Sequence, residues 1–216
     1  MNYIFFYSHT KQNAFVIDAN LKFHSIDLRV LSNLFVYNRE FPTSEAVYQS
    51  QKVDEKHQAD FLKMLQMCDK IDPKITAHLG QARGITIEEF EKLSFGTDVP
   101  DFLDIFNDIL RGGITKIRAK ARKDFDGWSA MWKALQMKKK NGAFNSLHPM
   151  SNSVFIEWTE LDSIWATHLN GAGTNWLGIQ LTALFNGVEP VKPTGSFQIP
   201  SDVLKVVSEN KEHWNK

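Results

Sequence analysis

The chain begins with short hydrophobic runs and continues with segments of helical periodicity, and this order restricts the folds open to it. Tyr3–Tyr7 and Ala14–Ile17 are aromatic and β-branched with polar residues between them, which is typical of strands. Phe23–Val30 and Leu34–Tyr37 continue the pattern, and one compact strand candidate follows much later, at Val154–Trp158. Because strands and helices do not alternate strictly, the sequence predicts a helix-rich, single-domain α+β fold with a small sheet. A doubly wound fold is disfavoured.

Helix signals fill the middle and the end of the chain. Pro42–Ser44 forms a helix start ahead of a run that reaches Lys52, and apolar residues recur at helical spacing after Asp54. A short helix is expected from Pro73 to Gly80. The remaining helix signals are a capping box at Thr86 and Glu89, an amphipathic segment at Phe102–Ile109, a helix from near Asp126, a helix at Trp176–Phe185 closed by Gly187, and a terminal helix around Val203–Ser208.

The length and charge of the chain limit the classes of function that it can have. The 216 residues carry 25 Lys and Arg against 25 Asp and Glu, which argues against bulk electrostatic binding of long nucleic acid. Arg111–Lys140 is locally basic, which fits either a solvated helix face or a cradle for a phosphorylated ligand. We expect residues 1–187 to form one domain with a helical insertion near 84–113. Residues 188–216 are expected to add a loop and a terminal helix packed on it.

The sequence also predicts a compartment. The first residues lack the basic start and cleavage site of a secretory signal, and the single Cys68 cannot form an internal disulfide. No apolar run approaches the roughly 20 residues needed to cross a bilayer. We therefore expect a soluble, cytoplasmic protein without a membrane partner.

Several familiar sites can be set aside. The glycines of residues 171–178 do not fit the dinucleotide fingerprint, because Trp176 occupies the third glycine position. The histidines show no paired ligand spacing, and one cysteine cannot build a thiolate zinc site. The serines lie in no nucleophile-elbow sequence, which disfavours an acyl-transfer hydrolase. We expect neither a metal nor a cofactor.

Residues 42–52, PTSEAVYQSQK, form the first of three candidate clusters. Helical geometry aligns Glu45, Gln49 or Tyr48, and Lys52 along one face, because offsets of three, four and seven residues coincide there. A carboxylate, an amide and an ammonium would then point together. The plainer interpretation is an exposed helix on which Glu and Lys happen to align.

The other two clusters lie near the end of the chain. Glu157, Glu160 and Asp162 lie among tryptophans that include Trp165, where an acid can keep its proton or face a sugar while a ring stacks on a base. An aromatic strand edge is the plainer interpretation. Residues 171–178 place Thr174 and Asn175 at a helix start, where free backbone N–H groups can hold phosphate. A plain helix cap is the alternative there.

Taken together, these segments resemble a known family. In order and spacing, they are similar to the successive signatures of the NADAR (YbiA-like) family, over roughly residues 26 to 185. The matching segments are LSN at 31–33, PTSEAVYQSQK at 42–52, GWSAMWKALQMKKKNGAF at 127–144, FIEWTELDSIWATHL at 155–169 and GAGTNWLGIQL at 171–181. Two departures stand out. Ala166 replaces the family's usual glycine, and Phe185 and Asn186 stand where an arginine usually ends the last helix.

The resemblance implies a YbiA-like fold and an N-glycosidase. Its members are associated with removing ADP-ribose from guanine in DNA or RNA and with cleaving phosphorylated intermediates of riboflavin synthesis. A ligand-binding module without catalysis is a third possibility, which the two departures keep open. The ligand would be ADP-ribose or a ribose-phosphate adduct, in a cleft between the Glu45 helix and the Trp165 segment. The residues implied are Glu45 and Asp162 as catalytic carboxylates, Trp165 as a stacking ring, Asn33, Gln49, Glu157, Thr174 and Asn175 as substrate contacts, and Lys52 at a phosphate.

Overall fold

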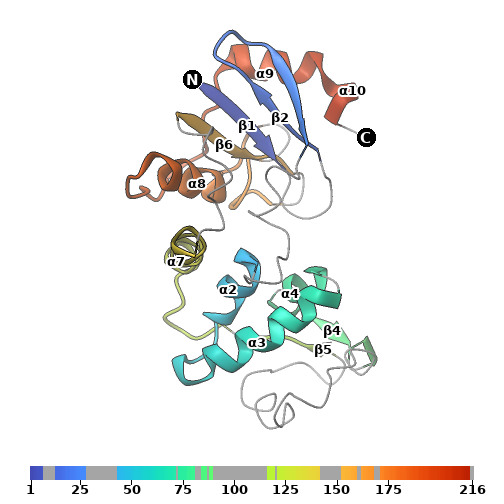
Figure 1. Ribbon diagram of the computed structural model, residues 1–216, viewed down its shortest axis with the longest axis vertical. Helices are drawn as coiled ribbons and strands as arrows, with labels where there is room; N and C mark the ends of the chain where they lie inside the picture. Colours follow the sequence, from blue (N-terminus) through green and yellow to red (C-terminus); the bar gives the residue numbers. More distant parts are fainter. Residues whose placement is uncertain are drawn as a thin grey trace. The chain divides into compact units, whose positions relative to one another are not determined.

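The computed structural model divides the chain into two compact units (Figure 1). One comprises residues 1–33 and 135–216 and is called the sheet unit; the other comprises 34–134 and is called the helical unit. The structure describes residues 1–6, 13–27, 43–71, 73–80, 84–86, 88–89, 116–119, 121–141, 152–159, 162–167 and 171–214. Helices and a small mixed sheet make the fold class α+β, as predicted.

A four-stranded sheet organises the sheet unit. Its strands, in spatial order, are β3 (Phe23–Asp27), β2 (Asn13–Ile17), β1 (Asn2–Phe6) and β6 (Ser153–Glu157). The first three pair antiparallel, whereas β6 pairs parallel to β1, with Ile4 opposite Phe155. The strands confirm the predictions at the start of the chain and at residue 154. The late strand joins the first one at its free edge, so the sheet depends on a long-range pairing.

Helices cover both faces of this sheet. Alternate residues of a strand point to opposite faces, so Phe5 and Ile156 share one face while Phe155 lies on the other. Helix α9 (Ser201–Glu209) packs on the first face through Val203 and Val207, which belong to the same buried cluster as Phe5 and Ile156. Helix α8 (Trp176–Asn186) lies against the second face, where Phe185 stacks on Phe155 at 5.0 Å between ring centroids.

The ends of these helices follow the sequence signals. Helix α8 ends at Gly187, whose φ of 70° lies in the left-handed region that glycine adopts without steric cost. The terminal helix was predicted around Val203–Ser208, and α9 contains that range. A further short helix, α10 (Lys211–Trp214), carried no recognised signal.

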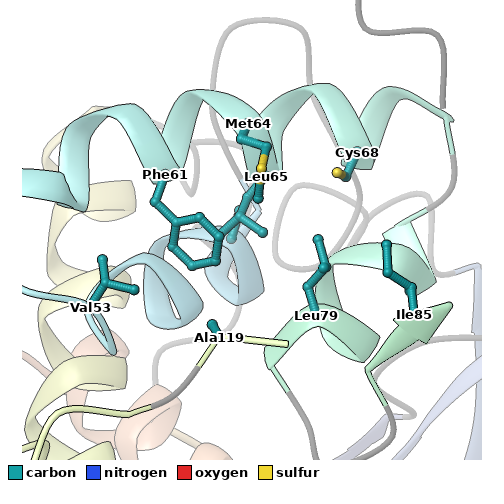
Figure 2. Close-up of a cluster of buried hydrophobic side chains, with 9 residues drawn as sticks. Val53, Phe61, Met64, Leu65, Cys68, Leu79, Ile85 and Ala119 are labelled. Atoms are coloured by element: carbon teal, nitrogen blue, oxygen red, sulfur yellow. The ribbon is translucent and has the colours of Figure 1, made fainter. Parts of the chain in front are cut away.

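The helical unit has a core of its own (Figure 2). Its elements are α2 (Ser44–Ser50), α3 (Glu55–Ile71), α4 (Pro73–Gly80), the short pair β4 (Ile85–Thr86) and β5 (Lys116–Ile117), and the first part of α7 (Gly127–Lys140). Phe61, Leu65 and Cys68 project from one face of α3, as their spacing predicts, and meet Leu79 of α4 and Ile85 of β4. Burial raises the pKa of the Cys68 thiol to about 12. The thiol therefore stays protonated and contributes to packing rather than acting as a nucleophile.

Side-chain caps fix two helix starts in this unit. The Thr86 N–H donates to Glu89 and the Glu89 N–H donates to the Thr86 hydroxyl, at 2.8 and 3.0 Å, which is the predicted capping box. Asp126 accepts from the Trp128 N–H at the start of α7, the helix predicted to begin near Asp126. Leu34–Tyr37 and Phe102–Ile109 lie outside the described residues, as does most of the expected insertion. No helix within the described ranges is long and apolar enough to cross a membrane.

Candidate functional site

Helix α2 positions the first group of predicted site residues. Its N-cap is Thr43, whose hydroxyl accepts a 3.0 Å hydrogen bond from the Ala46 N–H. The same hydroxyl donates to the Asp69 carboxylate of α3 at 2.7 Å. Because both bonds are buried, the first turn of α2, which contains Glu45, is held in place from outside the helix.

Asp69 joins three helices of the helical unit. It is 3% exposed and accepts from the hydroxyl of Thr43 and, at 2.6 Å, from that of Thr76 in α4. Burial raises the pKa of the Asp69 carboxyl; the bonds from Thr76 and Thr43 oppose the rise, and the nearby Glu45 adds to it. Sequence reasoning missed this residue. A signal existed, because Asp69 follows Phe61 and Leu65 at intervals of four and therefore lies on the apolar face of α3.

Glu45 and Gln49 meet on one face of α2, as the helical spacing predicts, whereas the expected helical position of Lys52 is wrong. The Gln49 Nε2 group donates to Glu45 Oε1 at 2.5 Å, and Gln49 is 2% exposed. Helix α2 ends at Ser50, so Lys52 belongs to the following turn rather than to the helix. Its ammonium nevertheless lies close enough to interact with Glu45, and it donates to the Gly80 carbonyl at 2.5 Å.

Aromatic rings lie near the Lys52 ammonium, and burial changes its pKa. The Nζ atom lies 5.1 Å from the centroid of the Tyr48 ring and 5.9 Å from that of Phe125, within reach of cation–π attraction. Burial lowers the pKa of this ammonium, and the Glu45 carboxylate partly opposes the fall. The group therefore holds one carboxylate and one partly desolvated cation.

The second group belongs to the sheet unit. Asp162 Oδ1 accepts from the N–H groups of Ile164 and Trp165, each at 2.8 Å, and so fixes the turn that carries Trp165. The Trp165 ring meets Trp176 edge to face, with centroids 5.3 Å apart and planes at 83°. Asp162 therefore has a visible structural task, which is to orient the tryptophan predicted to stack on a base.

The start of α8 corrects one expectation. Free N–H groups that could hold phosphate were one of two expectations here, beside a plain helix cap, and the turn that precedes the helix occupies these groups. The donors are Thr174, Asn175, Trp176 and Leu177, and the acceptors are the carbonyls of Ser163, Ala166, Ile164 and Trp165. A helix start that has already satisfied its donors in this way offers little to an anion. The glycines around it permit the close approach, since a Cβ on Gly173 would lie 2.1 Å from the Ala166 oxygen.

Asn175 also has a structural role. It is fully buried with a φ of 55°, and its amide accepts from the Glu157 N–H and donates to the Phe155 carbonyl, both at 2.9 Å. A Cβ on Gly178 would lie 2.3 Å from the Asn175 Oδ1 atom, so glycine is needed there for the amide to reach β6. Asn175 thus joins α8 to β6 beside the buried Glu157.

The predicted site residues fall into two sets. Glu45, Gln49 and Lys52 belong to the helical unit; Glu157, Asp162, Trp165, Thr174 and Asn175 belong to the sheet unit. A single cleft joining Glu45 to Trp165 stays a prediction. Asn33 and Glu160 lie outside the described residues. Of the two departures, Ala166 is fully buried and Phe185 packs on β6.

Metal-binding side chains do not gather in the part of the chain that the structure describes. No group of three or more His, Cys, Asp or Glu residues there could hold a metal ion. Comparison with known proteins gives no match to a family model, to a curated protein or to a solved structure.

Proposed function

We propose that the chain is an N-glycosidase that hydrolyses the ribose C1–N bond of ADP-ribosylated guanine, in nucleic acid or in nucleotides. The sequence resemblance to the NADAR family, with its YbiA-like fold, suggests the reaction. The observation that carries the proposal is the convergence of Glu45, Gln49 and Lys52, with an amide holding the carboxylate and a partly desolvated ammonium beside it. An exposed helix with an accidental Glu and Lys would not bury the intervening glutamine at 2% exposure.

The chemistry requires stabilisation of positive charge on the sugar. An acid protonates the base as the C1–N bond breaks, which gives an oxocarbenium-like state. Water then adds to C1 and gives up a proton, which restores the acid. A fixed carboxylate next to the sugar stabilises that state. Glu45 is the first candidate, since Gln49 orients it, and Asp162 is the second. Lys52 supplies a cation for a phosphate of the ligand, and Trp165 supplies a ring for its base.

Two alternatives follow from the same residues. A phosphorylated intermediate of riboflavin synthesis presents a similar ribose–amine bond, so the same carboxylate would serve it. A module that binds ADP-ribose without turnover is supported by the replacement of the family's glycine and arginine by Ala166 and the Phe185–Asn186 end of α8.

One assay distinguishes these possibilities. The protein is incubated with an oligonucleotide that carries ADP-ribosylated guanine and, separately, with the phosphorylated riboflavin intermediate. Released ADP-ribose or ribose phosphate is then measured by mass spectrometry. Release from the oligonucleotide supports the proposal, and release from the intermediate alone supports the first alternative. Binding without release from either substrate supports the module, whereas neither binding nor release contradicts all three.

A further inference from the structure

We propose that Gly80, the last residue of α4, is a positioning residue for the Glu45–Gln49–Lys52 group. It contacts no reacting atom in this scheme. It acts through two other residues: it leaves the space in which the Gln49 amide lies, and its carbonyl accepts the hydrogen bond from Lys52. The expected effect on turnover rests on the proposed function, whereas the placement of the Gln49 amide by Gly80 does not.

Because Gly80 has no side chain, the Gln49 amide has room to lie beside it. A Cβ atom built on Gly80 would lie 1.7 Å from Gln49 Oε1, 1.9 Å from Cδ and 2.3 Å from Nε2. Real Cβ atoms essentially never approach a neighbour within 3.0 Å, so any side chain at this position displaces the amide. The backbone does not itself require glycine, because Gly80 is not among the residues of positive φ. The space is therefore the reason for glycine here.

The carbonyl of Gly80 gives Lys52 its place. Carbonyls at the end of a helix have no partner within the helix and carry partial negative charge, so they attract cations. The Gly80 carbonyl accepts from the Lys52 ammonium, which burial would otherwise disfavour. One residue of α4 thus contacts both neighbours of the candidate catalytic carboxylate.

Displacement of Gln49 has a specific consequence. The amide is the far end of a flexible side chain, so it can swing aside at a modest cost in stability. It cannot then keep its 2.5 Å hydrogen bond to Glu45. Misplacement of a catalytic group by about 1 Å can lower a rate by about 100-fold. Gly80→Ala is therefore expected to separate the catalytic effect from the effect on folding.

The test compares five proteins: wild type, Gly80→Ala, Gln49→Ala, the double variant, and Gly195→Ala. The last is the matched control, since a Cβ on Gly195 meets nothing within 4 Å. Side-chain amide signals are recorded by ¹H–¹⁵N NMR, with the Gln49 signal identified by its loss in Gln49→Ala. Melting temperature and single-turnover release of ADP-ribose from the oligonucleotide are measured alongside.

The proposal expects the Gln49 signal to shift in Gly80→Ala and not in Gly195→Ala. Turnover should fall by about 100-fold while folding is retained, and the double variant should be no slower than Gln49→Ala alone. An unmoved signal, or an equal loss of rate in both backgrounds, would overturn it. If Gly80→Ala does not fold, the double variant should fold, because shortening Gln49 clears the space; failure of both would also overturn the proposal. A wild-type protein without turnover refutes the proposed function, while the NMR comparison still decides whether Gly80 positions Gln49.

Discussion

The Thr43 hydroxyl donates a 2.7 Å hydrogen bond to the Asp69 carboxylate while it accepts one from the Ala46 N–H. One hydroxyl thus serves both as the cap of α2 and as the link between α2 and α3. The carboxylate is buried and receives a second hydroxyl, from Thr76 of α4. Glu45 lies two residues after the cap, so the position of this candidate catalytic group depends on a buried polar network.

Removal of the cap should lower stability and activity together. Thr43→Ala deletes the acceptor for the Ala46 N–H, and loss of such a cap lowers the free energy of unfolding by about 1 to 2 kcal/mol. It also leaves Asp69 with one hydroxyl fewer. Chemical denaturation measures the loss, and Thr43→Ser, which keeps the hydroxyl, is the matched control. Equal stability of the alanine and serine variants would show that this hydroxyl does not hold α2.

Asp69 should give the protein a stability that declines above about pH 4. Burial raises the pKa of Asp69 in the folded state above its ordinary value of 3.8. The folded state then keeps a proton that the unfolded state has released, so stability falls as pH rises from the unfolded pKa to the folded one. Asp69→Asn cannot ionise. We therefore compare the free energies of unfolding of Asp69→Asn and wild type. The difference, variant minus wild type, should increase with pH across that window and level off above it. A flat difference would contradict the raised pKa.

Much of this fold was predictable because its signals are local. Pro42–Ser44 marked the start of α2, Pro73 and Gly80 bounded α4, and Thr86 with Glu89 formed a capping box. The parallel pairing of β6 with β1 was not predictable in this way, since nothing near residue 153 specifies a partner at the start of the chain.

The candidate site shows the same division between local and non-local information. Alignment of Glu45 with Gln49 follows from helix geometry and was predicted. The contribution of Gly80 depends on how α4 packs against α2, so no local pattern announces it. The start of α8 misled sequence reasoning for a related reason. A helix start predicts free donors only if no preceding turn has occupied them, and the carbonyls of residues 163–166 occupy these.

Lys52→Met should weaken ligand binding more than it weakens folding. Methionine keeps much of the apolar stem and removes an ammonium whose burial is costly, so the loss of its bond to Gly80 is partly offset. A charged hydrogen bond to phosphate contributes about 1.5 to 3 kcal/mol, which corresponds to about 10-fold to 100-fold in affinity. Calorimetry with ADP-ribose measures this loss. The control is Lys56→Met, at an exposed lysine outside the basic segment, which should leave the affinity unchanged.

Asp162 can be tested by two substitutions that separate its structural role from a catalytic one. Asp162→Ala removes the acceptor for the N–H groups of Ile164 and Trp165, so both turnover and the environment of Trp165 should change. Asp162→Asn retains an acceptor oxygen and removes the charge. Near-normal turnover in the asparagine variant, with unchanged tryptophan fluorescence, would assign Asp162 to the positioning of Trp165. A steep fall with unchanged fluorescence would instead assign its charge to the reaction.

Glu45→Gln provides the sharpest test of the proposed mechanism. Glutamine keeps the size of the side chain and an acceptor for Gln49, but it carries no negative charge to stabilise the oxocarbenium-like state. Loss of about 3 to 4 kcal/mol of electrostatic stabilisation corresponds to a roughly 100-fold to 1,000-fold drop in single-turnover rate, with ADP-ribose still bound.

The control for this substitution is Glu55→Gln, because Glu55 occupies the first turn of α3 as Glu45 occupies that of α2. Each change removes one negative charge near a helix N-terminus, which costs about 0.3 to 1 kcal/mol of stability at an exposed position such as that of Glu55. Glu45 is half-buried and accepts from Gln49, so its replacement should cost somewhat more stability, while turnover falls steeply in Glu45→Gln alone. If turnover in Glu45→Gln falls only in proportion to its loss of melting temperature, Glu45 is a structural carboxylate. The oxocarbenium-stabilising role then passes to Asp162 or is lost.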